Sequence, residues 1–546
     1  MTPALPDRAL SRRGLLKGLG LGAGALSLVG FLEACGSGAP GSASTSSANA
    51  SAGVDTGKAI ASLRVSLPGT LSNLYPGIES GILNYYLAAP VLESLTGVDA
   101  TGKIVPALAE SWTQPNATTY VFKLRAGATF HDGSPVTPAD VVASIKAASD
   151  PKISTATGSY WSNLAGYKQT GADEVTITTK TADQAFLWAT TNTDILWVMP
   201  ASYWSQHGKD VGTKAALPIG SGPYKVTDFE PDSHLTLTRN DAWWGTAPKV
   251  AEVSVEFVPD DSTRLLAWQS GKADMSLNVP LAQVSQWEGS KQTRVVSAAD
   301  RSWVGLILNL KQKPFDDPHV RRAVAYAIDR KTIVDSILKG HGQVALGLST
   351  PEQFGGVWTP EQATTQLQAI PQYDFDLAKA KAELAQSSVP NGFSVDLSYP
   401  NTGPQLGTAA LSFADALKPL GITINVKERS IDQWLAETNK PLAYMWYFNT
   451  TGDAAELASW FLADGNPAGY SNAAVTKLLA QQAAETDPTK RAQLIIQAQA
   501  AQAADLAYAP LWYGQSTTAF RDSIGVQDYS SYTLLGNWPG SVYAAK

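Results

Sequence analysis

The sequence predicts a large α/β protein. Its 546 residues suffice for two or three domains with substantial hydrophobic cores. Apolar residues make up 44% and charged residues 16% of the chain, which is typical of a folded globular protein. Beyond residue 375 predicted helices alternate with predicted strands, namely helices over 376–386, 408–420 and 431–439 and strands over 394–399, 422–428 and 443–448. Such alternation indicates a mixed layer of sheet and helices.

The charge balance argues against a nucleic-acid partner. The chain holds 41 Lys and Arg against 48 Asp and Glu, a net charge of −7. Removing residues 1–34, which contain four basic and two acidic residues, makes the net charge −9. Nucleic-acid binding relies on clustered basic side chains, and no basic cluster follows the first 34 residues.

Cysteine and histidine usage predicts neither a disulfide nor a metal site. Cys35 is the only cysteine, so no intrachain disulfide can form. The five histidines are scattered and form neither an HExxH motif nor a close pair. We therefore expect no metal and no other cofactor.

Residues 1–35 have the features of an export signal. Ser11 to Lys17 matches the twin-arginine pattern SRRxxLK, which marks export through the Tat route. A weakly hydrophobic, glycine-rich run follows over 18–32. At about fifteen residues this run is too short to span a membrane comfortably.

A lipid anchor is predicted at the end of this signal. Leu32-Glu33-Ala34-Cys35-Gly36 resembles a lipobox, in which the cysteine becomes the lipidated N-terminus, although Glu33 departs from the usual small or apolar residue. The alternative is an incidental buried cysteine. Residues 36–58 form a Gly/Ser-rich tract without apolar periodicity, typical of a flexible tether. We expect a protein held at the outer face of the cytoplasmic membrane.

The stretch over 217–274 is the most informative part of the chain. It opens with a glycine-rich corner, Gly220-Ser221-Gly222-Pro223. Three strands follow, over 224–229, 235–239 and 253–258, and a turn with two tryptophans lies between the last two. Asp260 to Thr263 then offers N-cap oxygens to a helix that ends before Gly271.

These motifs resemble extracellular solute-binding protein family 5, the binding proteins of ABC importers that take up peptides. In that family GxGPY, RNxxWxG and PDDxTRLxALQSGxxD occur in the order found here. The segments GKIVPALAESW at 102–112 and PFDDPHVRRAVAYAIDR at 314–330, the latter a predicted capped helix, match the family as well. The resemblance covers about residues 60–525.

The resemblance implies a two-lobed periplasmic-binding-protein-like fold (type II, cluster C) with an extra subdomain inserted in the first lobe. The implied parts are a signal over 1–35, a tether over 36–58, first-lobe segments over 59–95, 206–300 and 511–546, an inserted subdomain over 96–205 and a second lobe over 301–510. Predicted strands over 303–309 and 509–513 lie next to the lobe boundaries, and the strand over 443–448 is expected to cross between the lobes.

The resemblance also points to a ligand site. Peptide-binding relatives hold the α-amino group of the ligand with an aspartate soon after a Gly-Trp pair. Aligning Trp446 with that tryptophan places Asn449 at the amine-binding position, beside neutral Thr450, and Asp453 beyond it, although Met445 replaces the glycine. Either Asp453 takes the role through a shifted loop, or the ligand has no free amine there. In the unshifted alignment Asp453→Ala is expected to change affinity little.

Further candidates surround this segment. One of Trp446 and Tyr447 is expected to face the core and the other the cleft. The remaining candidate ligand contacts are Gly220, Ser221, Gly222, Tyr160, Trp161, Ser516 and Thr517. His131-Asp132 could suggest a catalytic dyad, but no nucleophile accompanies it, so we interpret it as a turn that leads into a helix capped by Thr137.

Two classes of function compete. The first is a monomeric binding protein that hands an oligopeptide to a membrane permease and its ATPase. An oligosaccharide or a nickel chelate are the alternative ligands. The second is a secreted hydrolase, which no GxSxG motif, metal cluster or Cys/His pair supports. We therefore expect a non-enzymatic binding protein.

Overall fold

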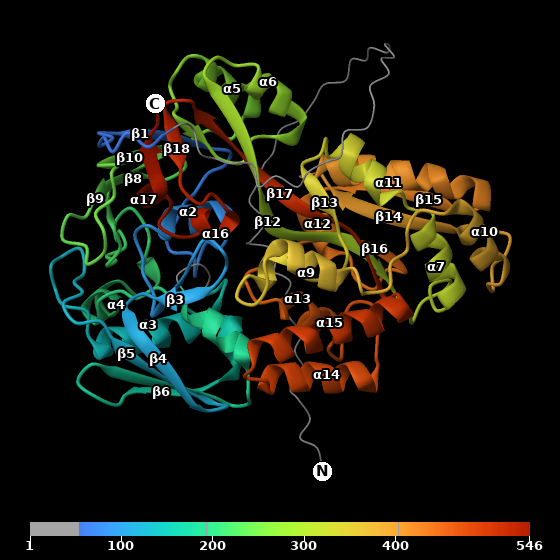
Figure 1. The fold of residues 1–546 in the computed structure, drawn as a ribbon, viewed down its shortest axis with the longest axis horizontal. Coiled ribbons are helices and arrows are strands. Elements are labelled where there is room, and N and C mark those ends of the chain that lie inside the picture. Colours follow the sequence, from blue (N-terminus) through green and yellow to red (C-terminus); the bar gives the residue numbers. More distant parts are fainter. Residues whose placement is uncertain (1–53, 192–194, 402) are drawn as a thin grey trace.

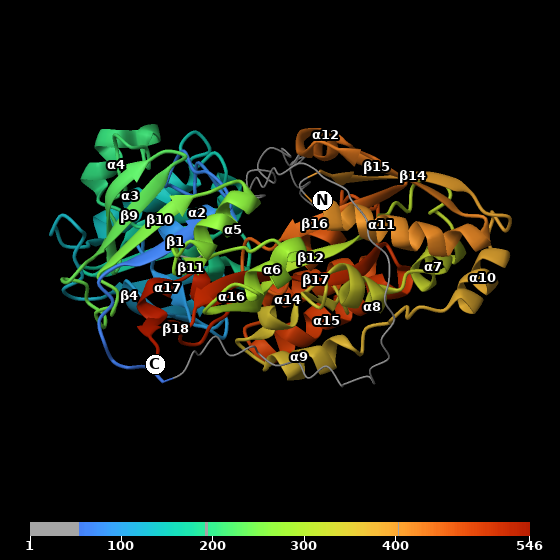
Figure 2. The same cartoon turned by 90° about the horizontal axis from the view of Figure 1, so that it is seen from above.

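The computed structural model describes residues 54–191, 195–401 and 403–546. It shows two α/β lobes side by side, joined by strands that run through the middle of the molecule (Figures 1 and 2). The predicted export signal and the lipidation site Cys35 lie outside the described residues. Within the described part of the chain, no helix is both long and apolar enough to cross a membrane.

One nine-stranded sheet extends through both lobes. Its order is β16-β12-β17-β11-β1-β10-β9-β8, and β13 pairs with β17. The strands are β1 (Leu63–Leu67), β8 (Tyr224–Glu230), β9 (His234–Arg239), β10 (Glu252–Phe257), β11 (Met275–Ser276), β12 (Thr293–Leu308), β13 (Gly342–Val344), β16 (Leu442–Phe448) and β17 (Tyr508–Arg521). Strand β1 is parallel to β10 and β11, and the other pairs are antiparallel.

The two long strands β12 and β17 connect the lobes. They pair from Thr293↔Arg521 to Ile307↔Tyr508, with an irregularity between Ala299 and Trp303. At one end β17 pairs with β11 of the first lobe, and at the other end β12 pairs with β16 of the second. The sequence predicted only one part of each strand.

The prediction that the strand over 443–448 crosses between the lobes is wrong. Strand β16 pairs with β12 only over 302–308 and forms one end of the sheet. The reason is that its residues alternate between two hydrophobic clusters of the second lobe. Leu442 and Tyr444 pack into one cluster, and Ala443 and Met445 pack against the other.

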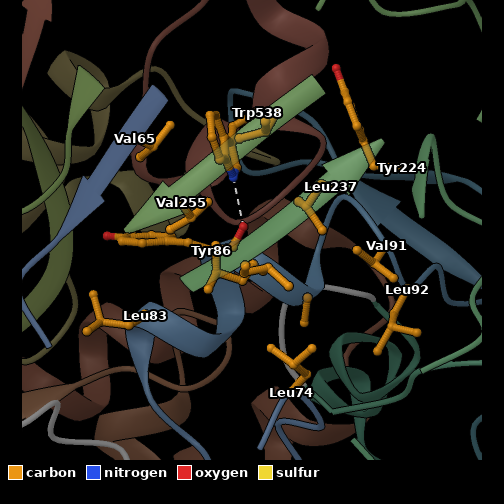
Figure 3. Packing of buried hydrophobic residues seen from close by; sticks show 14 of the residues in the cluster. Val65, Leu74, Leu83, Tyr86, Val91, Leu92, Tyr224, Leu237, Val255 and Trp538 are labelled. Carbon is orange, nitrogen blue, oxygen red and sulfur yellow. Dashed lines mark hydrogen bonds between the residues drawn. The ribbon is translucent and has the colours of Figure 1, made fainter. Parts of the chain in front are cut away.

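The core of the first lobe lies between the sheet and the helices that cover it. Its other elements are α2 (Ile82–Ala88), β2 (Thr96–Val98), β3 (Ile104–Pro106), α5 (Asp261–Gln269), η4 (Leu281–Gln283), α6 (Val284–Glu288), β18 (Ile524–Val526), α16 (Ser531–Leu534), α17 (Trp538–Ser541) and β19 (Val542–Ala544). Trp538 packs against α2, and its indole N–H donates to the Tyr86 carbonyl at 2.7 Å (Figure 3). The C-terminal segment thereby closes the core of the first lobe.

The subdomain is a four-stranded antiparallel sheet covered by helices, at the lower left of Figure 1. Its elements are β4 (Ala109–Asn116), β5 (Thr119–Leu124), α3 (Pro138–Ser149), η1 (Gly158–Asn163), β6 (Leu164–Gln169), β7 (Glu174–Thr179), η2 (Gln184–Thr190), α4 (Ala201–His207) and η3 (Gly208–Asp210). Thr137 is the N-cap residue of α3, as predicted, and the Asp140 carboxylate accepts its backbone N–H at 2.9 Å.

The second lobe confirms the predicted alternation of helices and strands. Its remaining elements are α7 (Pro318–Tyr326), α8 (Arg330–Thr332), η5 (Ile333–Ile337), η6 (Pro351–Phe354), α9 (Pro360–Leu367), α10 (Leu377–Ala385), β14 (Ser394–Pro400), α11 (Pro404–Leu417), η7 (Lys418–Leu420), β15 (Thr423–Arg429), α12 (Ile431–Ala436), α13 (Glu456–Leu462), α14 (Ala473–Ala484) and α15 (Pro488–Asp505). The single helix predicted over 314–330 is interrupted after Tyr326, because the Asp329 side chain caps a new helix.

Candidate ligand-binding site between the lobes

The loop over 449–455, between β16 and α13, lies where the lobes meet. Asn449 at its start is 3% exposed. Its backbone N–H and its Nδ2 both donate to the carbonyl of Arg301, at 3.3 and 2.7 Å. The Nδ2 end of the amide is therefore held by the crossing strand β12. The Oδ1 end is buried and has no hydrogen-bond partner among the described residues.

Glu456 shapes this loop. One carboxylate oxygen accepts the Tyr447 hydroxyl at 2.7 Å and the Thr450 N–H at 2.9 Å. The other accepts the Thr451 N–H and hydroxyl, both at 2.6 Å. Burial raises the pKa of Glu456, although these donors favour its charged form. All of these hydrogen-bond donors belong to the second lobe, as Glu456 itself does.

The Asp453 carboxylate is likewise bound within the second lobe. Its side chain is 2% exposed and forms a bidentate ion pair with Arg491 on α15, at 2.7 and 2.8 Å. It also accepts the backbone N–H of Ala455 at 2.8 Å. Both oxygens of Asp453 are thus engaged inside the second lobe, next to Asn449 in the chain but not free for a ligand.

The predicted pair Tyr160-Trp161 divides between two environments. Tyr160, 36% exposed, donates its hydroxyl to Thr450 Oγ1 at 2.6 Å and so joins the subdomain to the second lobe. Trp161 is 3% exposed and packs in the subdomain core, with its ring edge-on to Phe186 at 5.9 Å. The structure brings Tyr160 to the junction and places Trp161 in the core.

The crossing strands add residues that sequence reasoning missed. Asp300 accepts the Ser302 N–H at 2.9 Å and the Ser516 hydroxyl at 3.1 Å, which places the predicted residue Ser516 at the crossing. Arg301 has a left-handed φ of 62° and lies over the ring of Tyr532 at 5.4 Å. Thr517 is buried and donates to the Val279 carbonyl of the first lobe.

A second carboxylate, Glu352 on η6, lies near Asp300. The Tyr532 hydroxyl donates to the Glu352 carbonyl at 3.3 Å. Burial raises the pKa of both Asp300 and Glu352, and the charge of Asp300 raises that of Glu352 further. The one signal in the sequence was the charged pair Asp300-Arg301, which only Ser302 separates from an apolar run.

The glycine corner serves the interior of the first lobe. A Cβ on Gly220 would lie 1.9 Å from the Val91 carbonyl oxygen, and one on Gly222 would lie 2.5 Å from that of Pro90. The buried Ser221 donates to the Glu93 carboxylate at 2.8 Å. Gly220 and Gly222 therefore pack against the backbone of a neighbouring first-lobe segment, and Ser221 binds the Glu93 side chain of the same segment.

Glu93 connects the turn that carries two tryptophans to this glycine corner by hydrogen bonds. It is 6% exposed and accepts the indole N–H groups of Trp243 and Trp244, at 3.2 and 3.1 Å. Burial raises the pKa of Glu93 to about 7, although these donors favour the charged form. The RNxxWxG turn and the GxGPY corner are joined by a single carboxylate.

Two other predictions concern side chains near these segments. His131 Nε2 lies 3.0 Å from the Gly222 carbonyl, and Asp132 accepts the Ser134 N–H at 2.9 Å, so both hold a turn. Trp446 packs on one hydrophobic cluster of the second lobe and Tyr447 on the other. Of these two aromatic residues, Tyr447 reaches the junction through its bond to Glu456.

Comparison with known proteins identifies the family. The sequence model described as bacterial extracellular solute-binding proteins, family 5, middle part, matches residues 103–469. This chain belongs to that family. The predicted two-lobed fold with an inserted subdomain is confirmed by solved structures of the same kind.

Three known proteins illustrate what this chain is similar to. The glutathione-binding protein GsiB of Escherichia coli is 27% identical over 453 residues, covering 80% of this chain and 85% of GsiB. The Helicobacter pylori periplasmic binding protein DppA, solved with the peptide STSA, is 23% identical with a TM-score of 0.71, covering 90% of this chain and 99% of that one. AgaA of A. tumefaciens, solved with agropinic acid, is 23% identical with a TM-score of 0.70, covering 89% and 99%.

Proposed function

We propose that this protein captures a peptide or peptide-like solute between its lobes and delivers it to the permease of an ABC importer, without catalysis. The observation that supports this most is the junction itself. Two strands connect the lobes, and polar groups of the subdomain, the crossing strands and the second lobe converge on loop 449–455. Glutathione binding by GsiB and the peptide bound to DppA support a peptide-like ligand.

Ligand identity is tested by native mass spectrometry of the purified protein. A co-purified peptide supports the proposal. An oligosaccharide, a nickel chelate or an acid such as the agropinic acid bound by AgaA would keep the transport role and overturn the ligand class. Turnover of the bound molecule would overturn the non-enzymatic assignment.

Binding is expected to stabilise the protein and to draw the lobes together. At a hundredfold excess over the dissociation constant, a ligand that binds only the folded state adds about 2.7 kcal/mol of stability. The unfolding temperature should rise, and small-angle scattering should give a smaller radius of gyration. A tight ligand that leaves the scattering unchanged would contradict closure.

We also propose that the protein is a monomeric lipoprotein anchored through Cys35 and exported by the Tat route. Cys35→Ser is expected to move the protein from the membrane fraction to the soluble fraction, because a thioether-linked lipid can no longer form. Fractionation and intact-mass measurement check this. Persistence of the variant in the membrane fraction, together with an unmodified wild-type mass, would rule out the anchor.

The site is proposed not to hold a free α-ammonium at the Asn449 position. Asn449 is neutral, and the carboxylates of Asp453 and Glu456 are engaged within the second lobe. An ammonium buried at the Asn449 amide would have no carboxylate bonded directly to it, and burying a charge without a hydrogen-bonded counter-charge costs several kcal/mol. The buried Oδ1 of Asn449 suits a neutral donor such as an amide N–H.

Trialanine and N-acetyl-trialanine should therefore bind the wild type with similar affinity. Asn449→Asp should favour the free amine by about tenfold or more, since a charge-assisted hydrogen bond contributes about 1.5–3 kcal/mol. Calorimetric titration measures both. Unfolding is measured alongside, because the variant loses the Nδ2 donor to the Arg301 carbonyl.

Asn391→Asp is the matched control. It adds the same charge at an exposed position of the second lobe and should leave the preference unchanged. A wild type that strongly prefers the free amine would refute the neutral end group.

A further inference from the structure

Gly452, in loop 449–455, lies in close contact with a side chain of the opposite lobe. A Cβ at this position would lie 2.2 Å from Cη2 of Trp188 and 2.5 Å from its Cζ3. Gly452 is not among the described glycines with positive φ, so its backbone conformation does not require glycine. Glycine is required at position 452 because a Cβ there would clash with the Trp188 ring.

Trp188 is buried but is not part of the hydrophobic core of its own subdomain. It lies on η2 and is 7% exposed, yet it belongs to none of the hydrophobic clusters formed by the described residues. Its neighbours Phe186 and Ala189 do belong to the subdomain core. The ring of Trp188 stacks on Tyr532 at 6.4 Å and covers Gly452.

One hydrogen bond between the subdomain and the second lobe lies close to this ring in the sequence. The Tyr160 hydroxyl donates to Thr450 at 2.6 Å, two residues before Gly452. Asp183, one residue before η2, is bound inside its own subdomain, where its carboxylate accepts the Asn163 Nδ2 and the Ala185 N–H, both at 3.1 Å. Helix α14 lies against η2, as Figure 1 shows at its lower centre.

We propose that the inserted subdomain is a latch, in which Trp188 and Tyr160 contact loop 450–453 and favour the closed arrangement of the lobes, so that a fraction of the ligand-free protein is already closed. Part of the free energy of closure then comes from protein contacts, and the population of closed protein sets the apparent ligand affinity. This inference deepens the proposed function, since it rests on closure as the binding step. Its test contains no ligand, so failure to find a peptide ligand leaves the outcome unaffected.

The test is amide hydrogen exchange of the ligand-free full chain, read in the subdomain helix 184–190 and in loop 449–455. Gly452→Ala forces the Trp188 ring away and should raise exchange in 184–190, on the opposite lobe, by about tenfold, or about 1.4 kcal/mol. Trp188→Ala should raise exchange in 449–455 by a similar factor. Gly356→Ala is the matched control, because a Cβ there meets nothing within 4 Å.

The double variant separates a latch from local damage. If Gly452→Ala acts through Trp188, adding it to Trp188→Ala should produce little further change in 184–190. Equal exchange of 184–190 in wild type, Gly452→Ala and Gly356→Ala would overturn the latch. So would additive effects of the two substitutions.

Discussion

Asp453→Ala is expected to destabilise the second lobe by about 3–5 kcal/mol, because it leaves the Arg491 guanidinium buried without its partner. The carboxylate is 2% exposed and binds both Nη atoms of Arg491, and no water can replace it at low cost. Urea unfolding followed by tryptophan fluorescence measures the loss. The unshifted alignment predicts little change in affinity for this substitution, and the ion pair now makes it primarily a stability variant.

Two further variants show whether the loss of stability comes from the buried ion pair. Asp415→Ala breaks an ion pair with Lys418 in the same lobe, but both side chains are about 70% exposed, so its cost should stay below about 1 kcal/mol. Asp453→Ala combined with Arg491→Leu removes the orphaned charge and should recover most of the lost stability. If Asp453→Ala costs no more stability than Asp415→Ala, the Asp453–Arg491 pair does not behave as a buried ion pair.

The regular parts of the second lobe could be predicted because their signals are local. Strands β14 and β15 and helix α10 lie within a few residues of the predicted ranges, since each has its own apolar periodicity and cap. The first half of β12 was missed. Its residues are mostly half-buried, and only pairing with β17, more than two hundred residues away, makes them a strand.

The candidate site was predictable as a segment but not as a set of contacts. The family alignment located the loop from Asn449 to Asp453. It could not show that Asp453 pairs with Arg491, 38 residues further on, because an arginine on an amphipathic helix is usually solvated. The close packing of Gly220 and Gly222 on another backbone segment could not be predicted for the same reason. Their requirement comes from carbonyl oxygens at Val91 and Pro90, far away in the sequence.

Glu93→Gln is expected to remove a pH-dependent loss of stability of about 3 kcal/mol. Burial raises the pKa of Glu93 from 4.5 to about 7. Between these values the folded protein holds a proton that the unfolded chain has released. The stability contributed by this proton is fully present below pH 4.5 and is lost as pH rises through 7. Urea unfolding of wild type and variant at pH 5 and pH 8 measures the difference.

In the Glu93→Gln variant the amide oxygen still accepts from Ser221 and Trp244, but the NH₂ group faces the indole N–H of Trp243. Because these two donors cannot bond to each other, the free energy of unfolding at pH 5 should fall by about 1 kcal/mol. At pH 8 it should equal or exceed the wild type. His131 gives stability the opposite pH dependence, because burial lowers its pKa to about 4 and its stabilisation is lost as pH falls below 6.5. Only the comparison of wild type with the variant therefore isolates the effect of Glu93. Glu110→Gln, which removes an exposed carboxylate whose pKa Lys123 lowers, is the control and should not flatten the profile. Parallel pH profiles for wild type and Glu93→Gln would mean that Glu93 is ionised without cost in the folded lobe.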